Sequence, residues 1–367
     1  MKVPPWRDMA LRLRVDYKGY ENPYLAGVLR TIRTREATDD KDRSYATYGV
    51  LQRLGVKNLS QPEYSKPLGQ VYQELIRDLL QWNSVAISLL LDAGAHSNIE
   101  APSWVPGWSI APKKQWIRSE YIIEPVINPT SEVWLEFRGN DGLVVKGARI
   151  DTVEFSSRGF RKISNFGIIL PNPAEVGSAT LVFIRWLRFL DRDTPVHPAY
   201  QDPAGTAAKI LDAAIDSKAE LHLLDREEFH DWYRLLTTSK ACLQEPINIE
   251  TDSDTGQFED NIIEQTYGGY TGNYSTKELT VAICNHLAGR RNIFATTSGL
   301  VGSGPEAMSS GDIVAQILGI PIPIVLREVP YSDDKGSCLA YRVIGPAFVY
   351  EETEDDRKEY SENIILI

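Results

Sequence analysis

Residues 132–155 read EVWLEFRGNDGLVVKGARIDTVEF, and this stretch predicts two strands joined by a tight turn. The runs Glu132–Phe137 and Leu143–Phe155 are rich in the β-branched and aromatic residues that favour strands. Between them, Gly139-Asn140-Asp141-Gly142 supplies residues that tolerate positive φ angles. We therefore predict a β-hairpin at this point of the chain.

The clearest helix signal precedes the hairpin, at Pro67–Trp82. Apolar residues recur there at spacings of three and four, with polar residues between them, and Pro67 stands near the start, where its missing N–H costs nothing. The apolar stripe consists of Leu68, Val71, Tyr72, Leu75, Ile76, Leu79 and Leu80. The same spacing, more weakly, predicts helices over Asp42–Leu54 and over Ser84–Ala93, the second ended by Gly94.

The second half of the chain is predicted to be helical first and β-rich afterwards. Helices are expected over Ala179–Leu190, Ala204–Ser217 and Arg226–Lys240, and a further helix runs from the capping box at Ser275 to Gly289. Strands and turns follow from Asn292 to Tyr350. We predict an α+β protein with a helical lobe and a small curled antiparallel sheet or barrel, whose strands come from both sides of the helical insert.

This reading divides the chain into five parts. Residues 1–118 form an N-terminal helical region and residues 119–175 a first β segment. Residues 176–290 form a helical insert, in which the acidic and then Gly/Tyr-rich stretch 250–272 is a candidate mobile loop or lid. Residues 291–350 form a second β segment that completes the sheet or barrel, and residues 351–367 form a charged tail.

Composition restricts the class of protein. The chain has 367 residues, of which 43% are hydrophobic and 24% charged, as in ordinary soluble domains. No apolar run reaches the length of a membrane span, and the net charge of −11 argues against nucleic acid as a partner. Three scattered cysteines (Cys242, Cys284, Cys338) favour a reducing compartment, so we expect a cytoplasmic protein.

Several segments resemble the fungal heterokaryon-incompatibility (HET) family. Residues 35–51 (REATDDKDRSYATYGVL) are similar to its A-T-D-P-R-D-R-I-Y-A-L-L-G-L signature, with Asp40 and Lys41 in place of Pro-Arg. Residues 64–72 (YSKPLGQVY) resemble the D-Y-S-K-P…V-Y segment, and residues 102–109 (PSWVPGWS) resemble P-S-W-V-P-D-W-S. Similar matches occur at 143–153, 293–327 and 341–350.

The resemblance concerns the C-terminal region of that family. HET proteins also carry an N-terminal, TIR-like half with a W-I-D-x-x-C-I-N-Q type segment, which is taken as their signalling part. No such segment occurs here, and 34 residues precede the first matching motif. The resemblance therefore implies a HET-like C-terminal half without the TIR-like half.

A search for chemistry in the sequence finds no cofactor motif. No P-loop, G-x-G-x-x-G or G-x-S-x-G sequence occurs, and the five histidines form no pair at metal-binding spacing. The acidic runs 39–42 and 355–359 are typical of capping and solvated faces. Cys284 and His286 are two residues apart on a helix and do not face each other. We predict no metal and no cofactor.

Aromatic residues are the remaining signal. Trp104, Trp108 and Trp116 share a proline-rich loop, where they could form core or line an apolar pocket for a hydrophobic small molecule. The first hypothesis is a cofactor-independent cyclase of a fungal secondary-metabolite (terpenoid or polyketide) pathway, such as an intramolecular Diels–Alderase. Such an enzyme needs only a shaped site and a hydrogen-bond donor. Its candidate catalytic residues are His286, Arg291 and Tyr48, and its candidate substrate-binding residues are Tyr45, Trp104 and Trp108.

The alternative hypothesis is a non-enzymatic HET-like interaction or regulatory module. It predicts a surface patch for a protein partner, whereas the cyclase predicts an enclosed apolar cavity. The sequence does not decide between them, and it leaves the oligomeric state open.

Overall fold

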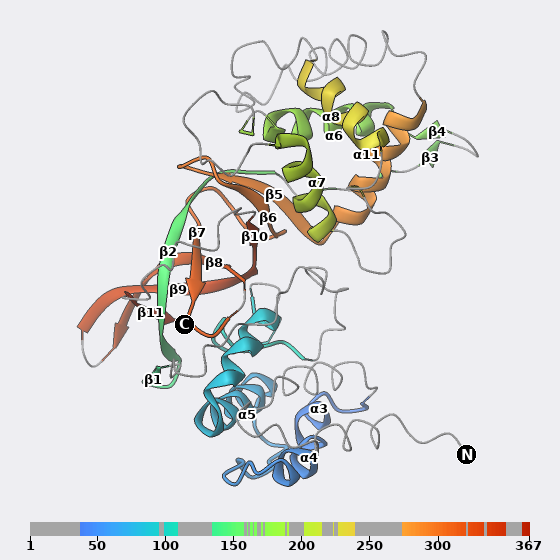
Figure 1. The fold of residues 1–367 in the computed structure, drawn as a ribbon. Helices are drawn as coiled ribbons and strands as arrows, with labels where there is room; N and C mark the ends of the chain where they lie inside the picture. The colour runs from blue at the N-terminus through green and yellow to red at the C-terminus, as the bar shows by residue number, and fades with distance from the viewer. Residues whose placement is uncertain are drawn as a thin grey trace.

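The structure is a computed structural model, and it describes residues 37–94, 99–108, 134–157, 160, 162–163, 165–166, 170–171, 173–187, 189–190, 202–214, 223, 227–238, 274–320, 322–333, 336–349 and 362–367. In this part of the chain, a curled sheet lies between two groups of helices (Figure 1). The predicted α+β class is confirmed. Predictions for residues 1–36, Trp116, the stretch 250–272 and the acidic run 355–359 lie outside the described residues.

The first helical group comes from the N-terminal part of the chain. It contains α3 (Asp42–Tyr45), α4 (Tyr48–Arg53), α5 (Leu68–Trp82) and the 3-10 helix η1 (Ser84–Asp92). The predicted helix over Asp42–Leu54 is broken into two, and the predicted helix at Ser84–Ala93 is a 3-10 helix. The stripe predicted for α5 is confirmed, since its residues from Val71 to Leu80 are buried while Gln70 and Gln81 are exposed.

The second helical group contains α6 (Pro173–Leu187), α7 (Pro203–Ala214), α8 (Glu227–Thr238) and α11 (Tyr274–Leu287). α6 starts at Pro173, so the helical insert begins before the predicted residue 176. Proline can begin the helix because it is well tolerated in the first turn. Its core is aromatic. The Phe183 and Trp232 rings meet edge to face at 5.3 Å, and Trp232 Nε1 donates to Thr280 Oγ1 at 2.8 Å.

The larger sheet is built from strands on both sides of this helical group. Its strands are β1 (Leu135–Arg138), β2 (Gly142–Ser156), β5 (Arg291–Thr296), β6 (Val301–Pro305), β7 (Ile313–Ile317), β8 (Ile324–Asp333), β9 (Gly336–Pro346), β10 (Phe348–Val349) and β11 (Glu362–Leu366). A separate two-stranded sheet joins β3 (Asn165–Phe166) to β4 (Leu170–Pro171). The hairpin predicted at the Gly139–Gly142 turn is confirmed as β1 and β2, with Arg138 opposite Gly142.

The long strand β2 holds the sheet together. It pairs with β1 and β11 along its first half, with β7 in the middle and with β5 at its end. Register shifts between Arg149 and Asp151, and between Val153 and Phe155, mark two irregularities of the β-bulge kind. Such bulges bend a strand and increase its twist. The pairings β2–β11–β9–β8–β7–β2 close into a ring, as expected for a curled sheet or barrel.

The last residues of the chain correct one prediction. The segment 351–367 was expected to be a charged tail, but Glu362–Leu366 forms strand β11 between β2 and β9. Burial alternates at its end, where Ile364 and Leu366 are buried and Ile365 is half-buried, while Glu362 and Asn363 are exposed. The charged residues before it masked this short strand pattern.

The described helices include none that is long and apolar enough to cross a lipid bilayer.

Gly147 is the position at which β2 leaves room for β11. A Cβ atom there would lie 2.5 Å from Ile364 Cδ1 and 2.9 Å from the Gln316 carbonyl oxygen. We predict that Gly147→Ala lowers the free energy of unfolding by roughly 1–3 kcal/mol, the usual cost of overpacking. Denaturant titration measures this change.

Gly49 provides the matched control, since it lies in α4 and a Cβ there meets nothing within 4 Å. Gly49→Ala should leave stability unchanged or raise it by up to about 1 kcal/mol through helix propensity. Equal effects of the two substitutions would contradict the close packing of β2 against β11.

Candidate functional site

The six residues selected from the sequence do not form one site. Tyr48, Trp104 and Trp108 belong to the core of the first helical group and the sheet, and Tyr45 packs against that core. Arg291 is on β5 and His286 is on α11, which packs against α6 and α8 in the other helical group (Figure 1). The structure thus groups the four proposed aromatic residues and separates them from the other two candidate catalytic residues, His286 and Arg291.

The two tryptophans are part of the core. The side chain of Trp104 is 1% exposed, and its Nε1 donates to the Asp141 carbonyl in the β1–β2 turn at 2.7 Å. Trp108 is 3% exposed, and its ring meets the Tyr72 ring edge to face at 5.2 Å. Both rings therefore stabilise the fold by burial and by aromatic contact.

Arg291 holds three strands together. Its guanidinium donates from Nη1 to the Pro346 carbonyl at 2.8 Å and from Nη2 to the Ser303 carbonyl at 2.6 Å. The side chain is fully buried, and this burial lowers the pKa of the guanidinium to about 9. A buried cation needs such acceptors because its loss of hydration is otherwise uncompensated. The role that the contacts assign to Arg291 is to join β5, β6 and the end of β9.

His286 and its neighbour Cys284 differ in environment. His286 is half-buried near the end of α11, whereas Cys284 is fully buried and its burial raises the pKa of the thiol well above the ordinary value. A thiol in this state is a poor nucleophile because the reactive form is the thiolate. The expectation that Cys284 and His286 form no catalytic pair fits this burial.

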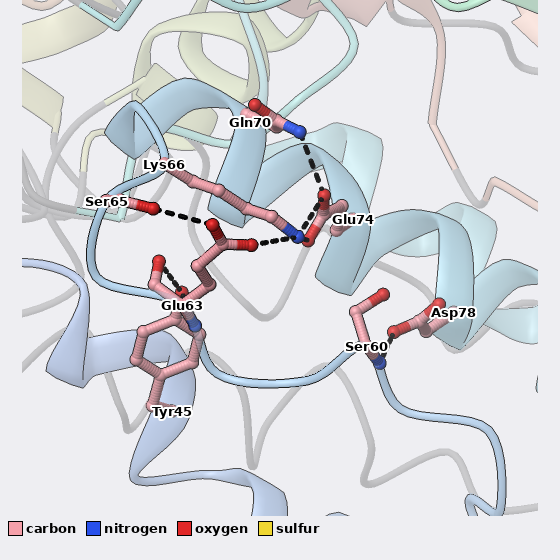
Figure 2. A network of polar contacts seen from close by, with 8 residues as sticks. All are labelled: Tyr45, Ser60, Glu63, Ser65, Lys66, Gln70, Glu74 and Asp78. Atoms are coloured by element: carbon pink, nitrogen blue, oxygen red, sulfur yellow. Dashed lines mark hydrogen bonds and ion pairs between the residues drawn. The ribbon is translucent and has the colours of Figure 1, made fainter.

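A polar network on the surface joins two of the HET-like segments. It connects α3, the loop 59–66 and α5 (Figure 2). Tyr45 Oη donates to the Glu63 carbonyl at 2.8 Å and accepts the Glu63 N–H at 2.9 Å. This reciprocal pair fixes the loop against α3, so that the residues after Glu63 project from a held backbone.

Tyr64 is the exposed centre of this region. Its side chain is 54% exposed, yet its Oη donates to Asp42 Oδ1 at 2.5 Å, and its carbonyl accepts from Lys41 Nζ at 2.6 Å. The Tyr45 and Tyr64 rings meet edge to face at 5.1 Å. The hydrogen bond to Asp42 raises the pKa of Tyr64, so the hydroxyl remains a donor at neutral pH. The ring is open to solvent, while Asp42 holds its hydroxyl and Lys41 holds the main chain of the same residue.

Lys66 closes the network onto α5. Its Nζ lies 2.9 Å from both carboxylate oxygens of Glu74 and 3.5 Å from Glu63 Oε2, while Ser65 Oγ donates to Glu63 Oε1 at 2.6 Å. The hydrogen bond from Ser65 lowers the pKa of Glu63, and the one to Glu74 raises the pKa of Lys66. Both groups therefore stay ionised near neutral pH. We call Asp42, Tyr45, Glu63, Tyr64 and Lys66 the Tyr64 cluster.

A second hydrogen bond attaches the same loop to α5. The Ser60 N–H donates to Asp78 Oδ2 at 2.6 Å (Figure 2). Asp78 is half-buried, and burial raises the pKa of its carboxyl group. The loop is thus anchored at Ser60 and at Lys66, on either side of Tyr64.

Tyr72 links the surface cluster to the core. Its hydroxyl donates to the Asp40 carbonyl, next to α3, at 2.8 Å, and its ring contacts Trp108. The three HET-like segments 35–51, 64–72 and 102–109 therefore meet around α5. These three segments form one continuous structure around α5.

Sequence reasoning overlooked Glu63, Tyr64 and Lys66 as site residues. The signal was present, because Tyr64-Ser65-Lys66-Pro67 is one of the segments that carried the resemblance. Exposure was the missing information, since sequence spacing does not distinguish a buried tyrosine from a solvent-facing one.

Comparison with protein-family models, with curated proteins and with solved structures finds no match to this chain. The HET resemblance therefore stays a prediction from the motifs. Within the described ranges, no three His, Cys, Asp or Glu side chains gather as a metal site would require.

Removal of the Trp104 ring tests its structural role. We predict that Trp104→Ala lowers the free energy of unfolding by about 3–5 kcal/mol, as for other buried aromatic residues. The control is Trp134→Ala, which removes a ring that is 41% exposed and has Lys146 Nζ 5.6 Å from its centroid. This substitution should cost at most about 1 kcal/mol. Chemical denaturation followed by circular dichroism measures both. Similar losses for the two variants would argue against a core role of Trp104.

Tyr48 predicts a specific dependence of stability on pH. Burial raises the pKa of this phenol from 10.0 to about 12. Between these values the folded state keeps the proton while the unfolded state releases it, so the free energy of unfolding falls as the pH rises. We predict a steeper loss of stability above pH 10 in the wild type than in Tyr48→Phe. Parallel curves from denaturation at several pH values would contradict this assignment.

Proposed function

We propose that this chain is an interaction module, and that it binds a protein partner through the Tyr64 cluster. The observation that carries the proposal is that the Tyr64 side chain is 54% exposed although Asp42 binds its hydroxyl and Lys41 binds its main-chain carbonyl. Tyrosines are enriched at the energetic centres of interfaces. A fixed ring loses little conformational entropy on binding, which favours affinity.

The charges around the ring indicate the chemistry of the partner. Three carboxylates lie near Tyr64. Glu63 precedes it in the chain, and the negative charges of Asp42 and Asp39 raise the pKa of its hydroxyl. Lys66 is already engaged with Glu74 and Glu63, and Lys41 with the Tyr64 carbonyl. A guanidinium can stack on a tyrosine ring and bind a carboxylate at the same time. The surface therefore fits a partner that presents arginine side chains.

The cyclase hypothesis receives less support from the geometry. Trp104 and Trp108 are nearly inaccessible to solvent, and the side chain of Arg291 is enclosed by Ser303 and Pro346. His286 lies in the other helical group. The residues chosen for that reaction do not surround a common space, so the interaction module is the better conclusion.

Selection of short random peptides on the immobilised full chain tests the proposal. We predict that arginine-containing peptides are enriched and that their binding weakens at least about tenfold, or roughly 1.4 kcal/mol, with Tyr64→Ala. Tyr64→Phe keeps the ring and should lose less. Because ion pairs at a surface are screened, binding should also weaken as salt is raised.

Trp134→Ala serves as the control, since it removes another exposed aromatic ring outside the cluster. Peptides that bind the wild type and Tyr64→Ala equally would refute the proposed surface. Accelerated cyclisation of a linear polyene terpenoid or polyketide by the chain, relative to buffer, would restore the cyclase hypothesis instead.

A further inference from the structure

Strand β11 occupies a slot in the ring of paired strands. It makes five register pairs with β2, from Glu362 opposite Gly147 to Leu366 opposite Leu143. On its other side, a single register pair joins it to β9, at Leu366 and Tyr341. The ring of pairings is therefore closed by β11, and its weakest junction is the one between β11 and β9.

The slot is shaped for this particular segment. Ile364 is 4% exposed and fills the space that Gly147 leaves by having no side chain. Leu366 is fully buried in the same core as Trp104 and α5. An extended segment with apolar residues at these two positions fits the slot, and a shift by one residue would turn both away from the core.

Ser103 fixes the end of the strand. Its N–H donates to the main-chain oxygen of Ile367 at 3.0 Å, and its hydroxyl contacts the same oxygen. The hydroxyl also accepts the Val343 N–H at 2.8 Å, and the Ile367 N–H donates to the Tyr341 carbonyl at 2.9 Å. Ser103, which stands in the segment 102–109, thus fixes the end of β11 against β9.

We propose that the slot between β2 and β9 also receives β11 from a second copy of this chain, so that two copies exchange this strand. Each copy carries both the strand and its matching slot, so exchange uses contacts that the structure already contains. Residues 351–361 precede the strand, and a stretch of this length can span roughly 36–40 Å when extended. This length limits how far β11 can be displaced while strand β10 stays in place.

Cysteines at one register pair detect the exchange. Asn363 lies opposite Lys146, and facing side chains of paired strands are close enough for a disulfide with small adjustments. Full chains with Cys242 and Cys338 replaced by Ser would carry either Lys146→Cys or Asn363→Cys, one of them with a size tag. After mixing and mild oxidation, we expect a crosslinked heterodimer on a non-reducing gel.

The controls separate strand exchange from random collision. Gln81→Cys, an exposed position on α5, replaces Lys146→Cys and should give little heterodimer with Asn363→Cys. Ile364→Asp on the Asn363→Cys chain should reduce the specific product several-fold, because the buried position rejects a charge. The double variant Lys146→Cys/Asn363→Cys in one chain should form an internal crosslink, which verifies the register.

Heterodimer at the Gln81→Cys level, with the internal crosslink intact, would overturn the proposal. So would heterodimer that is insensitive to Ile364→Asp. Native mass spectrometry of mixed isotope-labelled and unlabelled wild-type chains provides a test without substitutions, in which mixed dimers are expected and their absence counts against exchange. Neither readout involves the Tyr64 cluster, so the two proposals fail independently.

Discussion

The bend of β2 is the constraint on which the rest of the structure depends. A straight strand of this length would present one edge to the same neighbour throughout. Instead, β2 pairs in turn with β11, β7 and β5, and it carries one irregularity within its pairing with β7, after Arg149, and another within its pairing with β5, after Val153. Because bulges turn a strand and increase its twist, one strand can belong to a closed ring and then continue into the sheet of β5, β6 and β10.

This division of β2 also separates the two principal cores. Leu143 and Val145, in its first part, pack with α5 and η1, whereas Phe155, near its end, packs with the aromatic side chains of α6 and α8. Each helical group therefore covers a different part of one strand. The separation of Trp104 and Trp108 from His286 follows directly from this arrangement.

Burial and exposure divide the HET-like segments in a similar way. Tyr72 and Trp108 lie inside and support α5, while Tyr64 lies outside and is held by its neighbours. Tyr72 connects the two environments through its hydrogen bond to the Asp40 carbonyl. The segment that carries Asp42 is thus attached to the core through Tyr72, and Asp42 in turn holds the hydroxyl of Tyr64.

The buried polar groups show how the fold accommodates charge away from water. Arg291 directs its guanidinium at two carbonyl oxygens, and Asp312 directs its carboxylate at Arg327, with Nε–Oδ1 at 2.7 Å. Arg291 thereby connects β5 with β6 and with the end of β9, and Asp312, which precedes β7, connects to β8. Hydrogen bonds of this kind offset the cost of burial and specify which strands lie side by side.

Local pattern was sufficient for the elements whose signals lie within a few residues. The turn Gly139–Gly142 and the apolar stripe of α5 were predictable because backbone preference and helical periodicity act over short distances. The α+β class followed from the order of these elements. The sequence also identified the segments 64–72 and 102–109, although it did not distinguish core from surface within them.

Only the tertiary structure decided which of these residues meet. Contacts between residues far apart in the chain join β11 to β2 and Ser103 to Ile367. Such contacts also place Arg291 and Trp108 in different surroundings. Such contacts leave no periodic signal, because each needs one complementary neighbour rather than a repeated pattern. Exposure of Tyr64 is decided in the same way, since a tyrosine is compatible with core and with surface until its neighbours are placed.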